Sequence, residues 1–133
     1  MPFLLTEKLM KVTAGSSVPN LAKQLAFSLG LDWLPVDITR FADGETRVRF
    51  GAHAQGEEVL LVQSMICPAN EYLMELLLMA DGVKRLGCKT LTVLIPYLAY
   101  GRQDKELDIY TPLSAQLIAT LLKSSGVDRV IAV

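Results

Sequence analysis

Short apolar runs alternate with amphipathic segments through the second half of the chain, and this alternation constrains the fold most. The apolar runs cover residues 58–63, 91–95 and 130–133, and the segments between them, 68–86 and 111–125, carry apolar residues at helical spacing. Strands that are joined by helices run parallel, and their helices cover both faces of the sheet. The chain is therefore predicted to be an α/β protein with a mostly parallel sheet flanked by helices on both faces.

The first half of the chain begins with a strand and a helix. Residues 9–14 are a strand candidate, and Ser16 and Ser17 are candidate caps for the helix that follows. Pro19 lies in the first turn of this helix, where its missing N–H does no harm. Gly30 is the predicted end of the helix, because glycine is favoured just past a helix terminus.

Residues 34–41 and 46–50 are predicted to be two strands joined by a tight turn. The pair Asp43-Gly44 is typical of such turns, and residues 46–50 alternate polar and apolar side chains. We expect an antiparallel hairpin added to one edge of the parallel sheet. The predicted order is strand, helix, three strands, helix, strand, helix and strand, in a single domain over residues 1–133.

The two later helices carry clear apolar faces. The apolar stripe of the segment 68–86 leaves Glu71 and Glu75 outside it, so both are expected on a solvated face or at a subunit contact. The pair Thr111-Pro112 predicts the start of the last helix, because a cap residue is followed by proline at the first helical position. The buried face of this helix is predicted to comprise Leu113, Leu117, Leu121 and Leu122.

Composition excludes several classes of function. The 133 residues fit one domain, 51% of them are hydrophobic, and the formal net charge is -1. There is no polybasic block and no apolar run long enough to span a bilayer, so neither nucleic-acid nor membrane binding is expected. Cys67 and Cys88 are widely spaced and are typical of reduced thiols, which predicts a cytoplasmic protein.

The polar triplet Arg102-Gln103-Asp104 is the first candidate site. It follows the apolar run at 91–95, and open α/β sheets bind ligands outside the carboxyl ends of their strands. A guanidinium such as that of Arg102 suits phosphate oxygens, Gln103 can assist it, and Asp104 can orient both or contact a metal-bound water. The triplet can equally be a solvated loop with a local Arg–Asp pair, and the residues alone leave both interpretations open.

The segment around Phe41, Asp43 and Glu45 is the second candidate site. An aromatic ring beside two carboxylates can stack on a nucleobase and accept hydrogen bonds from its exocyclic amine. The alternative is an ordinary hairpin turn, with Asp43 and Gly44 serving the turn geometry and Phe41 in the core. Asp-Gly turns are common, so the residues by themselves favour the ordinary turn.

Common phosphate-binding and catalytic motifs are missing from the sequence. It contains no Gly-rich Walker loop, no dinucleotide fingerprint and no Ser-His-Asp order. His53 is the only histidine and has no nearby Cys or His, so it is predicted to be a solvated loop residue rather than a zinc ligand. A nucleotide would have to be bound without a common phosphate loop.

Taken together, these segments resemble the N-terminal half of ribose-phosphate pyrophosphokinase, also called phosphoribosyl pyrophosphate synthetase. Residues 40–45 look like the Arg-Phe-Ser-Asp-Gly-Glu segment of that family, and residues 95–104 look like its Pro-Tyr-x-x-Tyr-x-Arg-Gln-Asp segment. The other matching pieces come in the family's order, at residues 14–16, 62–64, 68–76, 111–115 and 125–130. The resemblance covers nearly the whole chain from about Lys11, and it implies a fold of the type I phosphoribosyltransferase kind.

The resemblance also implies an activity. The family transfers diphosphate from ATP to ribose 5-phosphate with magnesium, and it works as dimers that assemble into larger rings. The resemblance therefore implies a homo-oligomer with a dimer as its unit and a hexamer as the larger assembly. Phe41, Asp43 and Glu45 would hold the adenine of an ATP bound mainly by a neighbouring subunit. Arg102 and Gln103 would contact ATP near its phosphates, supported by Asp104.

Other parts of the family's site are implied to lie beyond Val133. These are an Asp-Leu-His segment that helps to bind magnesium, a catalytic loop with Lys and Arg, and the Thr-Gly-Gly-Thr segment that holds ribose 5-phosphate. We therefore expect no catalytic and no metal-binding residue in this chain, and no activity of the chain alone. Because the apolar run at 130–133 resembles an unfinished sheet edge, we also expect self-association.

One stretch departs from the family pattern. Residues 105–110 include two acids where many members are strongly basic, and Gln116 stands where lysine is frequent. The usual activation by phosphate and inhibition by ADP are therefore not expected. A non-catalytic regulatory or binding relative of the enzyme is the alternative function that this departure favours.

Overall fold

The computed structural model describes residues 10–133, and this part of the chain contains three helices and seven strands. The helices are α2 (Pro19–Leu29), α3 (Ala69–Arg85) and α4 (Ser114–Ser124). The strands are β1 (Met10–Ala14), β2 (Asp32–Trp33), β3 (Val36–Arg40), β4 (Thr46–Phe50), β5 (Glu58–Val62), β6 (Thr90–Ile95) and β7 (Arg129–Ala132). The predicted order is confirmed except for the additional short β2. Leu9, which was included in the first predicted strand, lies outside the described residues.

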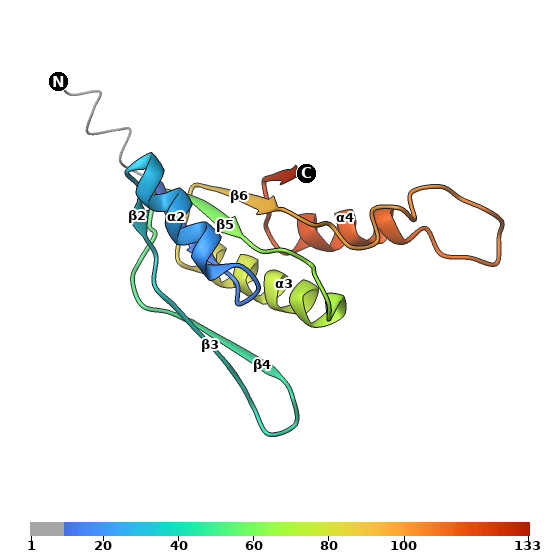
Figure 1. The fold of residues 1–133 in the computed structure, drawn as a ribbon, viewed down its shortest axis with the longest axis horizontal. Helices are drawn as coiled ribbons and strands as arrows, with labels where there is room; N and C mark the ends of the chain where they lie inside the picture. The colour runs from blue at the N-terminus through green and yellow to red at the C-terminus, as the bar shows by residue number, and fades with distance from the viewer. Residues whose placement is uncertain (1–9) are drawn as a thin grey trace.

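Five parallel strands form the central sheet in the order β2-β1-β5-β6-β7. Helices α3 and α4 pack on one face of this sheet, and α2 covers the other face (Figure 1). The chain moves across the sheet in one direction from β5 to β7 and in the opposite direction from β1 to β2. Because crossovers between parallel strands are right-handed, the connecting helices in these two parts lie on opposite faces of the sheet. The predicted mostly parallel α/β sheet with helices on both faces is confirmed.

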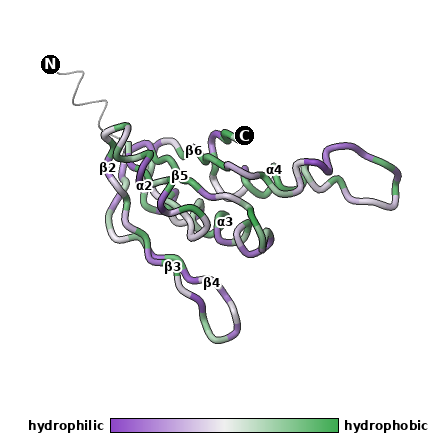
Figure 2. Tube along the Cα trace, viewed as in Figure 1, coloured by the Kyte–Doolittle hydropathy of each residue, from purple (hydrophilic) through white to green (hydrophobic). Residues whose placement is uncertain are grey.

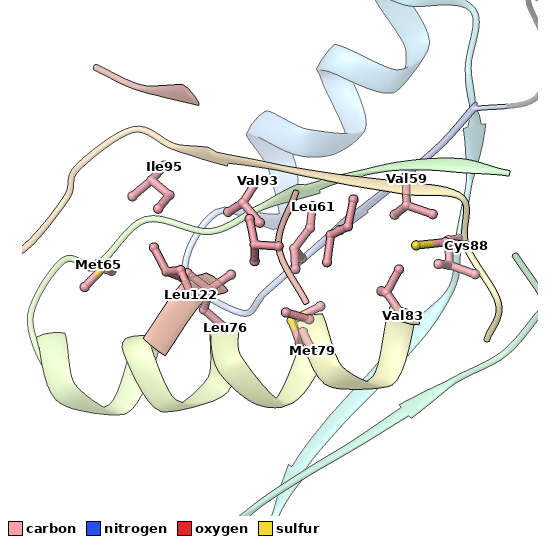
Figure 3. Close-up of a cluster of buried hydrophobic side chains, with 14 of the residues drawn as sticks. Val59, Leu61, Met65, Leu76, Met79, Val83, Cys88, Val93, Ile95 and Leu122 are labelled. Atoms are coloured by element: carbon pink, nitrogen blue, oxygen red, sulfur yellow. The ribbon is translucent and has the colours of Figure 1, made fainter. Parts of the chain in front are cut away.

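The main core lies between the sheet and α3 (Figure 3). Val59 and Leu61 from β5 and Val93 from β6 lie opposite Leu76 and Met79 of α3, and all of these side chains are fully buried. Burying one such side chain stabilises the fold by about 1.5–3 kcal/mol. The alternate residues of β5 face α2 instead, which gives the sheet an apolar surface on both sides and explains the continuous apolar run in the sequence.

The predicted hairpin is present, but it is not an edge of the main sheet. β3 and β4 form a separate two-stranded antiparallel sheet that extends away from the body of the molecule (Figure 1). Val36, Ile38, Val48 and Phe50 pack their inner side against the main core. An isolated hairpin is only marginally stable in water. The contact with α3 and its surroundings therefore stabilises this hairpin, in place of the expected pairing with the parallel strands.

Helix α2 does not start as its sequence predicts. Val18 precedes its first residue, and no side chain caps its free N–H groups. The Ser16 and Ser17 hydroxyls, the predicted caps, donate their hydrogen bonds to side chains from other elements. The end of the helix agrees with prediction, since Gly30 has a left-handed backbone conformation with φ of 64°.

Helix α4 also starts later than predicted. Its first residue is Ser114, and Leu113 rather than Thr111 occupies the position before it. The Thr111 hydroxyl donates to the carbonyl oxygen of Asp108, which places it in a turn of the preceding loop. The proline at position 112 therefore ends the loop instead of opening the helix.

Two side chains lie on the opposite side of their helices from the predicted one. Glu75 is fully buried, although the apolar stripe of α3 leaves it outside. Leu117 of α4 is 55% exposed, and the neighbouring Ile118 is buried in its place. The first difference arises because polar groups from the strand ends surround Glu75, an arrangement that a helical repeat cannot reveal.

The loop between β6 and α4 extends away from the rest of the molecule and carries exposed apolar residues. Leu107 and Ile109 are each more than 80% exposed, and Figure 2 shows hydrophobic positions along this loop. Among residues 10–133, no helix combines the length and the apolar character needed to cross a membrane.

Candidate functional site

The carboxyl ends of β1, β5 and β6 meet at one edge of the sheet, and polar side chains join the loops that leave them. Gly15, Ser16 and Ser17 follow β1, while Gln63 and Ser64 follow β5. Gln63 and Ser64 are both buried. Open α/β sheets bind ligands at this edge, so the edge is the natural frame for a site.

Glu75 of α3 is the centre of the buried polar network at this edge. Its Oε2 accepts from the Ser16 backbone N–H at 2.7 Å and from Gln63 Nε2 at 2.6 Å, and its Oε1 accepts from the Ser16 hydroxyl at 2.7 Å. Gln63 Oε1 in turn accepts from the Ser17 hydroxyl at 2.6 Å. These charge-assisted hydrogen bonds compensate for the burial of the carboxylate, so the network has a structural reason to persist.

The side chains of Glu75 and Gln63 occupy the space beside the loop between β1 and α2. In many α/β proteins this first loop and the following helix N-terminus hold a phosphate. Here the Glu75 carboxylate accepts the Ser16 N–H, and a Cβ at Gly15 would lie 2.1 Å from the Gln63 amide oxygen. The site for an external anion must therefore be sought at another strand end.

Arg102 lies in the loop that follows β6, at the same edge of the sheet. It is exposed, and it lines a hollow of about 400 Å³ together with residues that include Tyr97, Tyr100, Gln103 and Ala132. Within residues 10–133, Arg102 forms no ion pair, so the local Arg102–Asp104 pair considered from the sequence is not formed. The guanidinium is therefore accessible to an anionic ligand.

Gln103 joins this loop to the start of α4. Its Oε1 accepts from the Ser114 hydroxyl at 2.7 Å, its carbonyl oxygen accepts from Ala115 N–H at 3.0 Å, and its own N–H donates to the Tyr100 carbonyl oxygen at 3.0 Å. The side-chain oxygen is thus engaged, and its amide nitrogen is the group that remains to contact a ligand. Asp104 is exposed one residue further on.

Tyr100 has an unusual backbone conformation just before this triplet. Its φ of 69° is positive, which is rare for a residue with a bulky side chain and costs free energy. The Tyr100 hydroxyl donates to the side-chain oxygen of Asn70 in the first turn of α3. Contacts with α3 therefore accompany the strained turn from which Arg102 projects.

The hairpin tip presents the second predicted group. Phe41 is 53% exposed rather than in the core, and Asp43 and Glu45 are exposed beside it. The Glu45 backbone N–H donates to Asp43 Oδ1 at 3.0 Å, and hydrogen bonds from Glu45 lower the pKa of Asp43. The hydrogen bond with Asp43 raises the pKa of Glu45. The tip therefore displays an aromatic face next to a negatively charged carboxylate.

The structure does not bring the two predicted groups together within one chain. The hairpin tip and the loop after β6 extend from the body in different directions (Figure 1). Phe41, Asp43 and Glu45 are neighbours, and Arg102, Gln103 and Asp104 are neighbours, but each set stands by itself. Sequence reasoning missed Asn70 and Glu75, although polar residues directly after the β5 run, Gln63 and Ser64, signalled that this strand end is polar.

The remaining cavities and reactive groups point less clearly to chemistry. A hollow of about 630 Å³ lies along α4 and β7 and is lined mainly by apolar side chains such as Leu98, Ile118 and Val130. His53 is exposed in a loop, in agreement with its prediction. Burial raises the pKa of the Cys88 thiol, which makes it unreactive, and the other free thiol, Cys67, is exposed.

A parallel α/β domain with polar loops at the carboxyl edge of its sheet is the class that the fold and the site define. A sequence model of the N-terminal domain of ribose phosphate pyrophosphokinase matches residues 10–126. The chain therefore belongs to the ribose-phosphate pyrophosphokinase family, and it corresponds to the N-terminal domain of its members.

Individual relatives agree with this assignment. The ribose-phosphate pyrophosphokinase of Streptomyces coelicolor is 41% identical over 127 residues, and that of Aquifex aeolicus is 44% identical over 124 residues. These alignments cover 96% and 93% of this chain but only 39% and 40% of the relatives. The crystal structure of phosphoribosylpyrophosphate synthetase from Mycobacterium smegmatis has a TM-score of 0.87 and 38% identity over 92% of this chain and 41% of that protein.

Proposed function

We propose that this chain is the N-terminal part of a ribose-phosphate diphosphokinase, which transfers diphosphate from ATP to ribose 5-phosphate and gives 5-phosphoribosyl 1-diphosphate and AMP. The chain spans about two fifths of the curated relatives it matches. The observation that carries the proposal is the exposed Arg102, which has no ion-pair partner within residues 10–133 and lies beside a hollow of about 400 Å³ at the carboxyl edge of the sheet. Family membership supplies the reaction.

In this proposal Arg102 and Gln103 contact ATP near its phosphates. The guanidinium can place two N–H donors on phosphate oxygens, and Gln103 can add its amide N–H group while its oxygen stays bonded to Ser114. The family resemblance implies a supporting role for Asp104, although its side chain forms no ion pair with Arg102 within residues 10–133. Phosphoryl transfer depends mainly on positioning and on stabilisation of charge, so a cation at this point is what the ATP half of a site requires.

The hairpin tip is proposed to serve the ATP of a neighbouring subunit. Phe41 would stack on the adenine, and Asp43 and Glu45 would accept from its amine. The support is geometric, because the hairpin β3–β4 and the loop after β6 extend in different directions (Figure 1). Phe41 at the hairpin tip is 53% exposed. A composite site requires a second copy of the chain, so we propose a homo-oligomer with a dimer as its unit. A hexamer is the larger assembly that the family resemblance implies.

Magnesium is proposed as the ion that accompanies ATP. Among residues 10–133 no group of three or more His, Cys, Asp or Glu side chains is placed to hold a metal ion. We therefore assign no residue of 10–133 to a metal ion, and no step of the reaction is routed through one. Magnesium bound mainly by substrate phosphates is usual for enzymes that act on ATP. A cytoplasmic location is proposed on the basis of the two free thiols.

The test of the Arg102 role is calorimetric titration of magnesium-ATP into the chain and into Arg102→Ala. We expect saturable binding, weakened roughly 10- to 100-fold in the variant because a charge-assisted hydrogen-bonded contact is lost. The matched control is Arg129→Ala, which removes a cation from the start of β7. This residue lies at the amino ends of the parallel strands, whereas Arg102 follows their carboxyl ends. Equal affinities for the wild type and Arg102→Ala would contradict the proposal.

Mixing two defective variants tests the composite site. Arg102→Ala lacks one half of the proposed site and Phe41→Ala lacks the other, so a mixed dimer contains one intact site. We expect the equimolar mixture to recover part of the ATP binding that each variant lacks alone. If the mixture binds no better than the separate variants, the two groups do not combine across a subunit boundary.

A further inference from the structure

The loop that carries Arg102 is bonded at two points to groups that lead back to α3. At the first point the Tyr100 hydroxyl donates to the side-chain oxygen of Asn70. At the second point both backbone groups of Tyr97 are bonded to the end of β5. The Tyr97 N–H donates to the Ser64 hydroxyl at 3.1 Å, and its carbonyl oxygen accepts from the Met65 N–H at 2.8 Å.

The second point belongs to the buried network of Glu75. The Ser64 N–H donates to the Ser17 hydroxyl at 2.9 Å, and that hydroxyl donates to Gln63 Oε1 at 2.6 Å. Gln63 Nε2 donates to Glu75 Oε2 at 2.6 Å. A continuous chain of hydrogen bonds therefore runs from α3 to Tyr97, and every side chain in it is buried or half-buried.

We propose that the amino-terminal half of α3 positions the loop of Arg102, with Asn70 and Glu75 as the positioning residues. Neither residue lines the hollow beside Arg102, and each acts through a tyrosine of the loop. This inference rests on the proposed function, because the position of Arg102 matters only if Arg102 binds a phosphate group.

The backbone of Tyr100 gives the physical reason why the loop needs contacts with α3. A positive φ in a tyrosine is unfavourable and persists only where surrounding contacts impose it. The bond to Asn70 and the partial burial of the Tyr100 ring against the main core are those contacts. They set the direction of Gly101 and Arg102 before any ligand arrives, which lowers the ordering cost of binding.

Amide hydrogen exchange on the ligand-free chain tests the inference without reference to ATP. Asn70→Ala and Tyr100→Phe remove the same hydrogen bond from its two ends, and each should speed the exchange of residues 97–103 roughly three- to tenfold. Asn70→Asp keeps the accepting oxygen and should restore slow exchange. Asp81→Ala, near the far end of α3, is the control and should change nothing in this loop.

A double-mutant cycle separates positioning from a general loss of stability. The Asn70→Ala and Tyr100→Phe effects on loop exchange should not add, because they remove one interaction, while exchange in β1 and β5 stays unchanged. Additive effects, or faster exchange throughout the sheet, would overturn the inference. For the second point Ser64→Ala removes only the acceptor of the Tyr97 N–H, and an unchanged rate at Tyr97 would exclude the role of Glu75.

Magnesium-ATP titration of the same variants connects the inference to function. Asn70→Ala and Tyr100→Phe should weaken binding by equal factors, again roughly three- to tenfold. Weaker binding with unchanged loop exchange would overturn the positioning role. If the wild-type chain binds no magnesium-ATP, the proposed function of the chain fails, and the exchange measurements still decide whether α3 positions the loop.

Discussion

At the scale of single residues, the side chain that lies against position 15 leaves room only for glycine. Gln63 occupies the space that a Cβ at this position would take, with three amide atoms within 2.5 Å of it. Gly15 also donates its N–H to the Val62 carbonyl oxygen at 2.9 Å, so its backbone is fixed to the end of β5. The close approach of the Gln63 side chain to the backbone, rather than a positive φ, is the reason for glycine here.

Gly15→Ala should therefore destabilise the protein. The added methyl group must displace Gln63 and disturb its bond to Glu75, at a cost of about 1–3 kcal/mol in the free energy of unfolding. Urea denaturation of the wild type and the variant measures this difference. Ser28→Ala, at an exposed position of α2, is the control, and its midpoint should not fall. An unchanged midpoint for Gly15→Ala would mean that Gln63 moves freely.

The two carboxylates of the hairpin tip should titrate separately. Hydrogen bonds from Glu45 lower the pKa of Asp43, and the hydrogen bond with Asp43 raises the pKa of Glu45. As the pH falls, Glu45 takes up its proton first and Asp43 keeps its charge to lower pH. NMR titration of the side-chain carboxyl carbons should show this order. In Asp43→Asn the Glu45 midpoint should move down toward its ordinary value, and a midpoint that stays high would point to another cause.

At the scale of elements, the hairpin depends on its contact with α3. Phe50 of β4 packs against the face of α3 that contains Gly82, where a Cβ would lie 2.8 Å from the ring. Glycine at this point of α3 lets the ring approach the helix backbone. Arg40 adds an ion pair to Glu71 of α3 at 3.6 Å, which is exposed and contributes little. The apolar contact therefore sets the direction of the hairpin.

Phe50→Ala should loosen the hairpin without unfolding the main sheet. We expect a loss of about 1–3 kcal/mol, less than for a fully buried phenylalanine because Phe50 is only half-buried. Hydrogen exchange should increase in β3 and β4 and remain slow in β5 and β6. Arg49→Ala, on the outer side of the same strand, is the matched control. Equal acceleration in both sheets would show that the hairpin is not a separate unit.

Asp128 joins three elements at the other end of the sheet. Its Oδ2 accepts from Lys84 of α3 at 2.8 Å and from the Leu91 N–H of β6 at 2.8 Å. The hydrogen bond from Lys84, followed by that from Leu91, lowers the pKa of Asp128. Because the folded-state pKa is below the ordinary one, the stabilisation is complete above the ordinary pKa and is lost as the pH falls through the lowered value.

Asp128→Ala should cost about 1 kcal/mol at neutral pH, a modest value because the side chain is partly exposed to solvent. The difference between wild type and variant should shrink as the pH falls through the lowered pKa. Urea denaturation at a series of pH values measures it. A difference that grows in acid would contradict the assigned sign.

At the scale of the whole molecule, β7 leaves an apolar edge. It pairs with β6 on one side, and within residues 10–133 no strand pairs with its other side. Val130 and Ile131 are 46% and 52% exposed, and Val130 also lines the apolar hollow of about 630 Å³. Exposed strand edges of this composition pair with other chains.

The chain should therefore associate with itself as its concentration rises. Sedimentation velocity over a concentration series should show an increasing average mass for the wild type and less association for Ile131→Lys, since an edge lysine opposes pairing. Thr120→Lys on the exposed side of α4 is the control for added charge. A wild-type chain that stays monomeric at high concentration would contradict this prediction.

The sequence by itself determined the alternation of strands and helices, because the spacing of apolar residues shows which face of each strand or helix is buried. It also placed Arg102 after a buried strand and Asp43-Gly44 at the tip of a hairpin, since strand ends and tight turns have local signatures. The predicted caps at Ser16, Ser17 and Thr111 were wrong, because the choice of hydrogen-bond partner depends on groups brought close by folding.

Only the tertiary structure decided the roles of Glu75 and of the hairpin. Glu75 lies outside the apolar stripe of its helix, yet donors from two strand ends, 12 and 59 residues away in sequence, surround it and make its burial possible. The hairpin stands apart from the sheet because its apolar side packs on α3. Contacts between distant segments have no local signal, whereas turns and periodic faces do, and this difference separates what the sequence could predict from what it could not.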